Sequence, residues 1–175
     1  MRSKKNIVLC GFMGCGKSTI GKMIAKIAQL KFIDLDDYIE EKENRKIKDI
    51  FAQEGEEYFR DLEYKATQEI SQMTNTVISA GGGTLTFDRN VEALRENNII
   101  IYIDVTLNNI KTRLKNDTTR PLLQKPNKDE VMQELYNKRI PLYKDASNFI
   151  VNGNKSPKFV SEEIYKIYKE VNKIK

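Results

Sequence analysis

A nine-residue stretch near the start of the chain restricts the possible fold more than any other feature. Residues 11–19 are GFMGCGKST, which matches the phosphate-binding P-loop pattern G-x-x-x-x-G-K-[ST]. An apolar run, Ile7–Cys10, precedes the stretch, and apolar residues at helical spacing follow it. Its glycines allow a tight turn that aims backbone N–H groups at phosphate oxygens, and the next helix adds the positive end of its dipole. The stretch therefore predicts a strand–loop–helix unit that binds a nucleotide.

Two residues at the end of this motif have separate expected roles. We expect Lys17 to reach the β- and γ-phosphates and the Ser18 hydroxyl to ligate magnesium. The alternative is a glycine-rich turn followed by an accidental Lys-Ser pair. The strand pattern before the motif and the helix pattern after it argue against that alternative.

Strand and helix patterns alternate through the rest of the chain, which predicts an open α/β sandwich with a parallel sheet. The length of 175 residues suits one domain, 1–175. We expect strands at 6–10, 31–34, 76–79, 99–103 and 148–151. We expect helices at 19–30, 38–43 and around 47–51, an interruption at Gly55 followed by a longer helix through 59–73, and helices around 91–94 and at 107–114, 129–143 and 157–172. The polar stretch 115–128 is too long for a tight connection, which predicts a mobile loop.

Composition narrows the partners and the compartment. The net charge is +5, but lysines alternate with acidic residues along the helical segments, and no basic cluster interleaves with aromatic residues. This distribution argues against a nucleic-acid partner. No stretch approaches the roughly 18 apolar residues of a membrane span. The two cysteines, Cys10 and Cys15, suggest no disulfide framework, so we expect the reducing cytosol. Histidine is absent, so any acid–base role falls to a carboxylate or to no residue.

Ligands of an open parallel sheet bind outside the carboxyl ends of its strands. Besides the P-loop, three features fall at such ends or beside them: Asp34 with Asp36, the triplet Gly81–Gly83, and the loop that holds Arg120. Asp34 and Asp36 alternate on what we interpret as an extended segment, so both project to the same side. One carboxylate near magnesium and one near a substrate hydroxyl would suit phosphoryl transfer. The alternative is an acidic helix N-cap, with Asp37 opening the helix.

The remaining polar candidates leave two interpretations each. Glu63 lies one turn after Arg60, so the two form a surface ion pair of little consequence or Glu63 aims Arg60 at an anion. The three glycines offer free N–H groups or form a flexible turn. Arg120 and Arg139 precede proline segments, where a lone arginine is usually a surface residue. The residues alone therefore indicate a P-loop phosphotransferase or NTPase with a small-molecule pocket.

Several segments together resemble the shikimate kinases. These are 11–21 (GFMGCGKSTIG), 32–40 (FIDLDDYIE), 50–51 (IF), 55–63 (GEEYFRDLE), 80–83 (AGGG), 120–123 (RPLL) and 139–143 (RIPLY). The resemblance implies the fold of the nucleoside monophosphate kinases, with a five-stranded parallel sheet, a shikimate-binding helical region at about 34–64 and a lid at about 115–128. It also implies transfer of the ATP γ-phosphate to the 3-hydroxyl of shikimate, in the synthesis of aromatic amino acids.

The same resemblance assigns roles to single residues. It implies that Mg²⁺ is held by Ser18 and Asp34, and that Asp36 accepts from shikimate hydroxyls, including the one that attacks. Shikimate is expected on Arg60, Arg139 and Gly81, Gly82 and Gly83. The nucleotide is expected on Gly14, Cys15, Gly16, Lys17, Ser18, Thr19, Arg113 (against adenine) and Arg120 (on the phosphates, with the lid). Lys17, Asp36 and Arg120 are the expected catalytic residues.

Shikimate and ATP are thus the expected partners, with no nucleic acid and no membrane, and we expect a monomer. The chain departs from the commoner family residues at Cys15, Leu35 and Asn44, none of which has a charged role. One rival is another small P-loop kinase, acting on a nucleoside monophosphate or gluconate. The other is a nucleotide-dependent module that binds nucleic acid through its basic surface, with the salt dependence that this entails.

Overall fold

The fold is built on one parallel sheet in a computed structural model that describes residues 5–117 and 126–174. Its strands are β1 (Asn6–Cys10), β2 (Lys31–Asp34), β3 (Thr76–Ser79), β4 (Asn98–Asp104) and β5 (Phe149–Asn152). They lie in the order β2-β3-β1-β4-β5 and every neighbouring pair is parallel. The expected five-stranded parallel sheet is confirmed.

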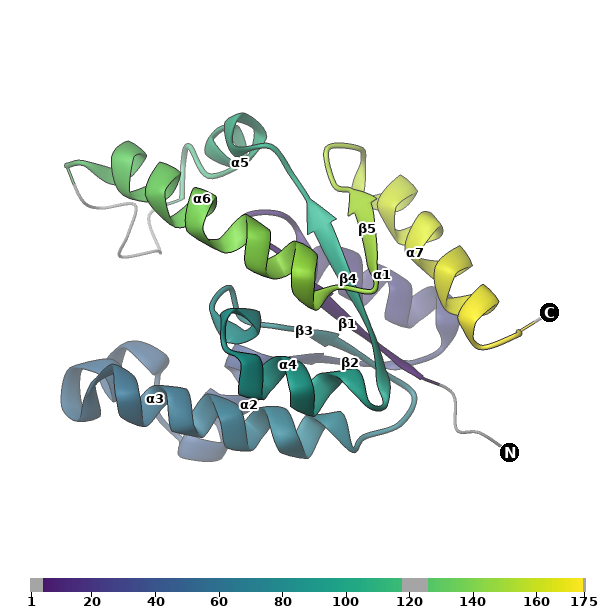
Figure 1. Ribbon diagram of the computed structural model, residues 1–175, viewed down its shortest axis with the longest axis horizontal. Helices are drawn as coiled ribbons and strands as arrows, with labels where there is room; N and C mark the ends of the chain where they lie inside the picture. The colour runs from purple at the N-terminus through teal and green to yellow at the C-terminus, as the bar shows by residue number, and fades with distance from the viewer. Residues whose placement is uncertain (1–4, 118–125, 175) are drawn as a thin grey trace.

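Within residues 5–117 and 126–174, seven helices and one 3-10 turn connect and cover the strands. They are α1 (Lys17–Ala28), α2 (Leu35–Glu43), α3 (Ile47–Ser71), η1 (Thr84–Thr86), α4 (Asp88–Arg95), α5 (Leu107–Arg113), α6 (Lys128–Ala146) and α7 (Pro157–Val171). Figure 1 shows α4 and α6 crossing in front of the sheet, with α1 behind it. Helix α7 packs against α1, and α3 packs against α4, which gives three layers.

The central strands explain why the sheet is covered on both faces. All five residues of β1 are buried, and so are the first six of β4. In their centres Val8 pairs with both Ile78 and Ile100. A strand that is apolar on both faces needs helices on each side, as parallel sheets typically have. Among the described residues, no helix combines the length and the apolar character needed to cross a membrane.

Gly55 interrupts α3, as the sequence predicts. Its backbone has φ 84° and ψ 178°, which is not helical, and the helix changes direction there. This region of backbone space is essentially restricted to glycine. Helix α2 begins directly at the carboxyl end of β2, and it contacts α3. We call α2 together with residues 47–54, the part of α3 before the interruption, the arm.

The order of the strands places a crevice beside β1. The chain leaves β1 through α1 toward β2 on one side of the sheet, whereas β4 and β5 lie on the other side. Where the direction of such connections reverses, the loops that follow neighbouring strands diverge and leave room for a ligand. The P-loop follows β1 at this point.

Candidate active site

A cavity of about 590 Å³ opens at the carboxyl edge of the sheet. It brings together residues from the P-loop, the end of β2, the loop after β3, and helices α5 and α6. The lining comprises Met13, Gly14, Gly16, Lys17, Ser18, Thr19, Asp34, Asp36, Ser79, Ala80, Gly81, Gly82, Gly83, Arg113, Leu114 and Arg139. Most of the site residues expected from the sequence therefore lie around one space, although Cys15 and Arg60 are not among its lining residues.

The P-loop has the backbone that its glycines predict. Gly16, the cap of α1, has φ 100°, and Gly14 has φ 75° with the side chain of Leu114 within 3.0 Å of where a Cβ would lie. Lys17 donates hydrogen bonds to the carbonyl oxygens of Gly11 (2.8 Å) and Phe12 (3.2 Å). The ammonium group is thus held over the loop that would surround phosphates.

The acidic segment after β2 differs from the prediction in its backbone. Asp34 and Asp36 do not alternate along an extended segment, because α2 begins at Leu35. Asp34 is the N-cap of that helix: its carboxylate accepts a hydrogen bond from the Asp36 backbone N–H (3.1 Å). The capping alternative was therefore correct for Asp34, although the helix begins before Asp37. Both carboxylates still line the cavity, because the cap and the first turn of α2 lie at its edge.

The Ser18 hydroxyl and the Asp34 carboxylate lie together in the cavity that Lys17 also lines. The Ser18 hydroxyl donates a hydrogen bond to the Asp34 carboxylate (2.8 Å). Within residues 5–117 and 126–174 there is no group of three or more His, Cys, Asp or Glu that could hold a metal ion. A hydroxyl and a carboxylate do suit Mg²⁺, which usually keeps several waters and binds one or two carboxylates together with substrate phosphates.

Asp36 has an unusual charge environment. The pKa of Asp36 is raised from the ordinary 3.8 to about 6, chiefly by burial and further by the charges of Asp34 and Glu63, while the charge of Lys17 acts in the opposite direction. Removing a carboxylate from water disfavours its charged form, and nearby like charges act in the same direction. Displaced pKa values of this kind are typical of functional clefts.

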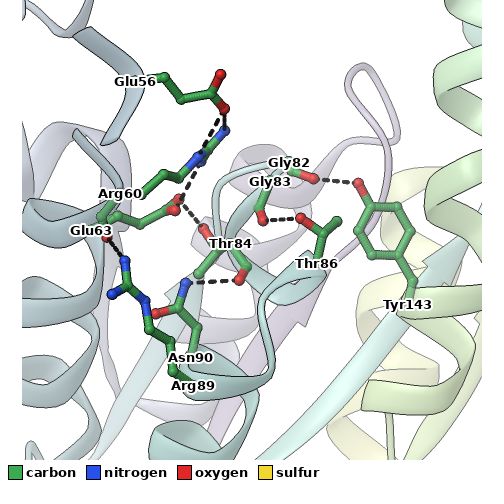
Figure 2. A network of polar contacts seen from close by, with 10 residues as sticks. All are labelled: Glu56, Arg60, Glu63, Gly82, Gly83, Thr84, Thr86, Arg89, Asn90 and Tyr143. Carbon is green, nitrogen blue, oxygen red and sulfur yellow. Dashed lines mark hydrogen bonds and ion pairs between the residues drawn. The ribbon is translucent and has the colours of Figure 1, made fainter. Parts of the chain in front are cut away.

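Arg60 and Glu63 are not a surface pair. Glu63 is 1% exposed, and it accepts hydrogen bonds from Arg60 (2.9 Å) and from the Thr84 hydroxyl (2.7 Å). Figure 2 shows the continuation of this network: Asn90 donates to the Thr84 carbonyl oxygen (2.9 Å) and Arg89 donates to the backbone carbonyl oxygen of Arg60 (2.8 Å). Glu63 thus fixes Arg60 at the cavity rim, which supports the interpretation that Glu63 aims it.

The glycine triplet owes its composition to close neighbours. A Cβ on Gly81 would lie 2.8 Å from an Asp36 carboxylate oxygen, and one on Gly83 would lie 2.9 Å from an Arg60 nitrogen. A Cβ on Gly82 would lie 3.3 Å from an Arg139 nitrogen. The loop is also braced by hydrogen bonds into η1, from Thr84 N–H to Gly81 and from Thr86 N–H to Gly83. This close packing argues against the flexible-turn alternative.

Arg113 joins the two sides of a second, smaller cavity. Its guanidinium donates to the carbonyl oxygens of Cys15 (3.2 Å) and Gly153 (2.8 Å). The second cavity, of about 240 Å³, is lined by the P-loop, Arg113, Lys155 and Pro157, among others. Arg120 and most of the expected lid, 115–128, lie outside the described residues.

Several polar residues that brace this site carried no signal in the sequence. Tyr143 contacts the glycine loop from α6, 61 residues away. Thr84, directly after the loop, donates to Glu63 and accepts from Asn90, and all of these side chains are buried. Of Tyr143, Thr84 and Asn90, only Tyr143 falls in a segment that resembles the shikimate kinases, and the resemblance gives it no role. Pairing across such sequence distances leaves no periodic pattern along the chain.

Comparison with known proteins assigns the chain to one family. The family model for shikimate kinase matches residues 13–171. The chain belongs to the shikimate kinase family. A shikimate kinase from Sulfurihydrogenibium sp. (strain YO3AOP1) is 45% identical over 160 residues, or 91% of this chain and 95% of the relative. One from Persephonella marina is 42% identical over 91% of this chain and 96% of the relative.

Solved structures agree with the family assignment. A shikimate kinase from Acinetobacter baumannii, in complex with shikimate, has a TM-score of 0.89 and 32% identity over 98% of this chain and 96% of that one. A gluconokinase from Sinorhizobium meliloti reaches a TM-score of 0.66 at 15% identity, over 99% of this chain and 96% of that one. The second likeness shows the shared fold alone. Shikimate kinases are ATP-dependent kinases, so the chain is an enzyme of that type.

Proposed function

We propose that this chain transfers the γ-phosphate of ATP to the 3-hydroxyl of shikimate, giving shikimate 3-phosphate and ADP. The observation that carries the proposal is the cavity in which the P-loop meets Asp36 and Arg139, with Arg60 beside Gly83 of its lining. The family of the chain supports the choice of acceptor. The proposed enzyme acts as a monomer on shikimate and ATP.

The acceptor half of the cavity suits a small hydroxylated carboxylate. Arg139 lies beside Gly82 and Arg60 beside Gly83, and arginine is the side chain whose planar fork suits a carboxylate. In the ligand-free structure Arg60 donates to Glu63 and to the exposed Glu56, so a substrate carboxylate would take the place of Glu56. The backbone of Gly81–Gly83 can approach a substrate closely because no side chain stands in the way. Asp36, at the side nearest Lys17, is the available acceptor for a hydroxyl proton.

The nucleotide half is formed by the P-loop, the second cavity and, outside the described residues, Arg120. Gly14, Cys15, Gly16, Lys17, Ser18 and Thr19 would surround the phosphates. The face of Arg113 would cover the adenine in the smaller cavity, while its nitrogens stay on the two backbone carbonyls. Arg120 would contact the phosphates when the proposed lid, about 115–128, closes over the site.

Ser18 and Asp34 would hold magnesium, with Asp34 acting directly or through water. When bound, the ion supplies charge neutralisation between phosphate oxygens. Lys17 contributes positive charge at the same phosphates. Because the transition state of phosphoryl transfer is loose, positioning and charge neutralisation matter more than a strong base.

Asp36 would then orient the attacking hydroxyl and receive its proton. An ordinary carboxylate is a weak base at neutral pH, and a pKa raised to about 6 brings Asp36 nearer to the working range of a proton acceptor. The position of the carboxylate beside Gly81, which carries no side chain, leaves room for the substrate.

The decisive experiment measures ADP release from MgATP with shikimate, gluconate or a nucleoside monophosphate as the acceptor. We expect shikimate to raise the rate of ADP release at least about tenfold, because it places a hydroxyl beside the γ-phosphate. Gluconate and the nucleoside monophosphate should leave the rate near the basal value, because the site excludes water and so limits hydrolysis of ATP. Stimulation by gluconate or a nucleoside monophosphate, without stimulation by shikimate, would replace this proposal with one of the rival kinases.

A further inference from the structure

Tyr143 lies one turn after Arg139 on α6 and is completely buried. Its hydroxyl donates a hydrogen bond to the carbonyl oxygen of Gly82, the middle residue of the glycine loop (Figure 2). This is a contact between a helix and a loop 61 residues apart in the chain. It ties the loop to the helix that carries Arg139.

The same phenol oxygen also meets Arg139 itself. Burial raises the pKa of Tyr143, while the charge of Arg139 and a side-chain hydrogen bond with it act in the opposite direction. An Arg139 nitrogen in turn lies 3.3 Å from where a Cβ on Gly82 would be. The tyrosine hydroxyl, the Gly82 peptide and the Arg139 guanidinium therefore form a three-way contact at the rim of the cavity.

The ring of Tyr143 also packs against an aromatic residue of β4. It packs against Tyr102, with the ring centroids 5.6 Å apart, and the Tyr102 hydroxyl donates to Asp104 (2.9 Å). A buried aromatic ring could fill this space without a hydroxyl, as phenylalanine would. The hydroxyl adds direction, because a buried phenol is normally satisfied by a specific partner.

We propose that Tyr143 is a positioning residue for the acceptor: it sets the relative placement of the Arg139 guanidinium and the Gly82 peptide to which the substrate carboxylate binds. This inference rests on the proposed function, because it needs an anionic acceptor at Arg139. Tyr143 acts through its two neighbours in the acceptor half of the proposed site, whereas the P-loop would hold the phosphates. Its contribution is therefore similar in the ground state and the transition state, which changes substrate affinity and leaves turnover intact.

The test is Tyr143→Phe, with Tyr136→Phe as a matched control. Tyr136 is also on α6, and its hydroxyl also donates to a backbone carbonyl oxygen, that of Val105 (3.0 Å), away from the glycine loop. Each variant loses one hydroxyl and keeps its ring. Calorimetric titration of shikimate into the nucleotide-free protein gives Kd, and steady-state assays give kcat and both KM values.

We expect Tyr143→Phe to raise Kd and KM for shikimate about threefold to tenfold, the range for one net hydrogen bond. The kcat and the KM for ATP should stay within about twofold of the wild-type values. Tyr136→Phe should lower Tm by about as much as Tyr143→Phe does, but it should leave shikimate affinity unchanged. Equal losses of shikimate affinity in the two variants would mean that the Tyr143 hydroxyl only stabilises α6, which would overturn the proposal.

A double-mutant cycle identifies the route. If Tyr143 acts through Arg139, adding Tyr143→Phe to Arg139→Lys should weaken shikimate binding by less than it does in the wild type. Full additivity would overturn the proposal, as would wild-type affinity in Tyr143→Phe. A wild-type protein that binds no shikimate would remove the proposed function and this inference together, whereas a binding wild type with an unaffected Tyr143→Phe removes the inference alone.

Discussion

At the scale of single residues, Asp36 combines a carboxylate with a site that disfavours its charge. Asparagine has nearly the same shape but lacks the capacity to accept a proton and is a weaker acceptor for a hydroxyl. We expect Asp36→Asn to lower kcat about 10²-fold or more, within the range of a positioned acid–base group. The affinity for ATP should barely change, as measured by nucleotide titration.

Asp37→Asn is the matched control, because Asp37 is the next residue and its side chain is exposed. It should retain kcat within about twofold, as surface substitutions generally do. Wild-type turnover in Asp36→Asn would mean that Asp36 serves only the first turn of α2.

Arg139 offers a second test at this scale, because lysine keeps its charge and changes only the geometry. A planar fork can meet both oxygens of a carboxylate, whereas an ammonium is a point charge on a flexible stem. Loss of one charge-assisted hydrogen bond, about 1.5–3 kcal/mol, should raise the KM for shikimate about 10- to 150-fold in Arg139→Lys. The KM for ATP should stay within about threefold.

Two other outcomes of Arg139→Lys would change the assignment. Unchanged constants would make Arg139 a structural residue of α6. A collapse of kcat with an unchanged KM for shikimate would place Arg139 on the phosphates instead.

At the scale of an element, the interruption of α3 separates the arm formed by α2 and residues 47–54 from the rest of the helix. Gly55 has open space where a Cβ would lie, so no clash prevents a larger residue. Its backbone conformation, φ 84° and ψ 178°, is what excludes one. A side chain at position 55 is therefore excluded by backbone strain and not by a clash.

We expect Gly55→Ala to lower the free energy of unfolding by about 1–3 kcal/mol, the cost of strain in this region of backbone space. Glu57→Ala, at a neighbouring exposed helical position, should change it by less than about 0.5 kcal/mol. Urea denaturation of both variants gives the comparison. Equal stabilities would show that the arm readily adopts a continuous helix through residue 55.

Local sequence patterns predicted most helices and strands. They failed at residues 34–37, where the same residues favour both the end of a strand and the start of a helix. The P-loop and the apolar strands have a fixed spacing that few other structures share. Asp34 to Asp37, in contrast, fits both an extended strand end and a capped helix, because aspartate favours each. The helix began at Leu35 because the Asp34 carboxylate captures the Asp36 N–H, a contact that the spacing of acidic residues does not reveal.

At the scale of the whole molecule, the sheet order explains what the sequence could and could not predict about the site. Residues that follow parallel strands share one edge, so the convergence of the P-loop, Asp36 and the glycine loop was predictable. The burial of Glu63 between Arg60 and Thr84 was not, because it depends on how α3 packs beside the loop after β3. The residues alone left a surface ion pair as the preferred alternative there.

The charge of the cavity should also affect global stability. Because the folded pKa of Asp36 is raised from 3.8 to about 6, the folded protein holds this proton more tightly than the unfolded chain. The wild type thus carries a penalty above pH 6 that disappears as the pH falls from 6 to about 3. Asp36→Asn should be more stable than the wild type by about 2–3 kcal/mol at pH 8, and by almost nothing at about pH 3, below the pKa of the unfolded chain.

Denaturant titrations of the ligand-free proteins across this pH range check the expectation. Asp37→Asn, with its exposed carboxylate, should show a much smaller gain. A constant advantage of Asp36→Asn at every pH would mean that the gain comes from packing and not from the buried charge.

The wall made by Gly81–Gly83 has a consequence for the evolution of this enzyme. Pockets usually acquire new specificity when one lining side chain is exchanged for another. Here three consecutive lining positions have no side chain to exchange, and a Cβ at each would press on Asp36, Arg139 or Arg60. A side chain added to this wall would therefore displace one of the three residues proposed to hold the acceptor, so a change of acceptor is easier to reach through substitutions elsewhere in the lining.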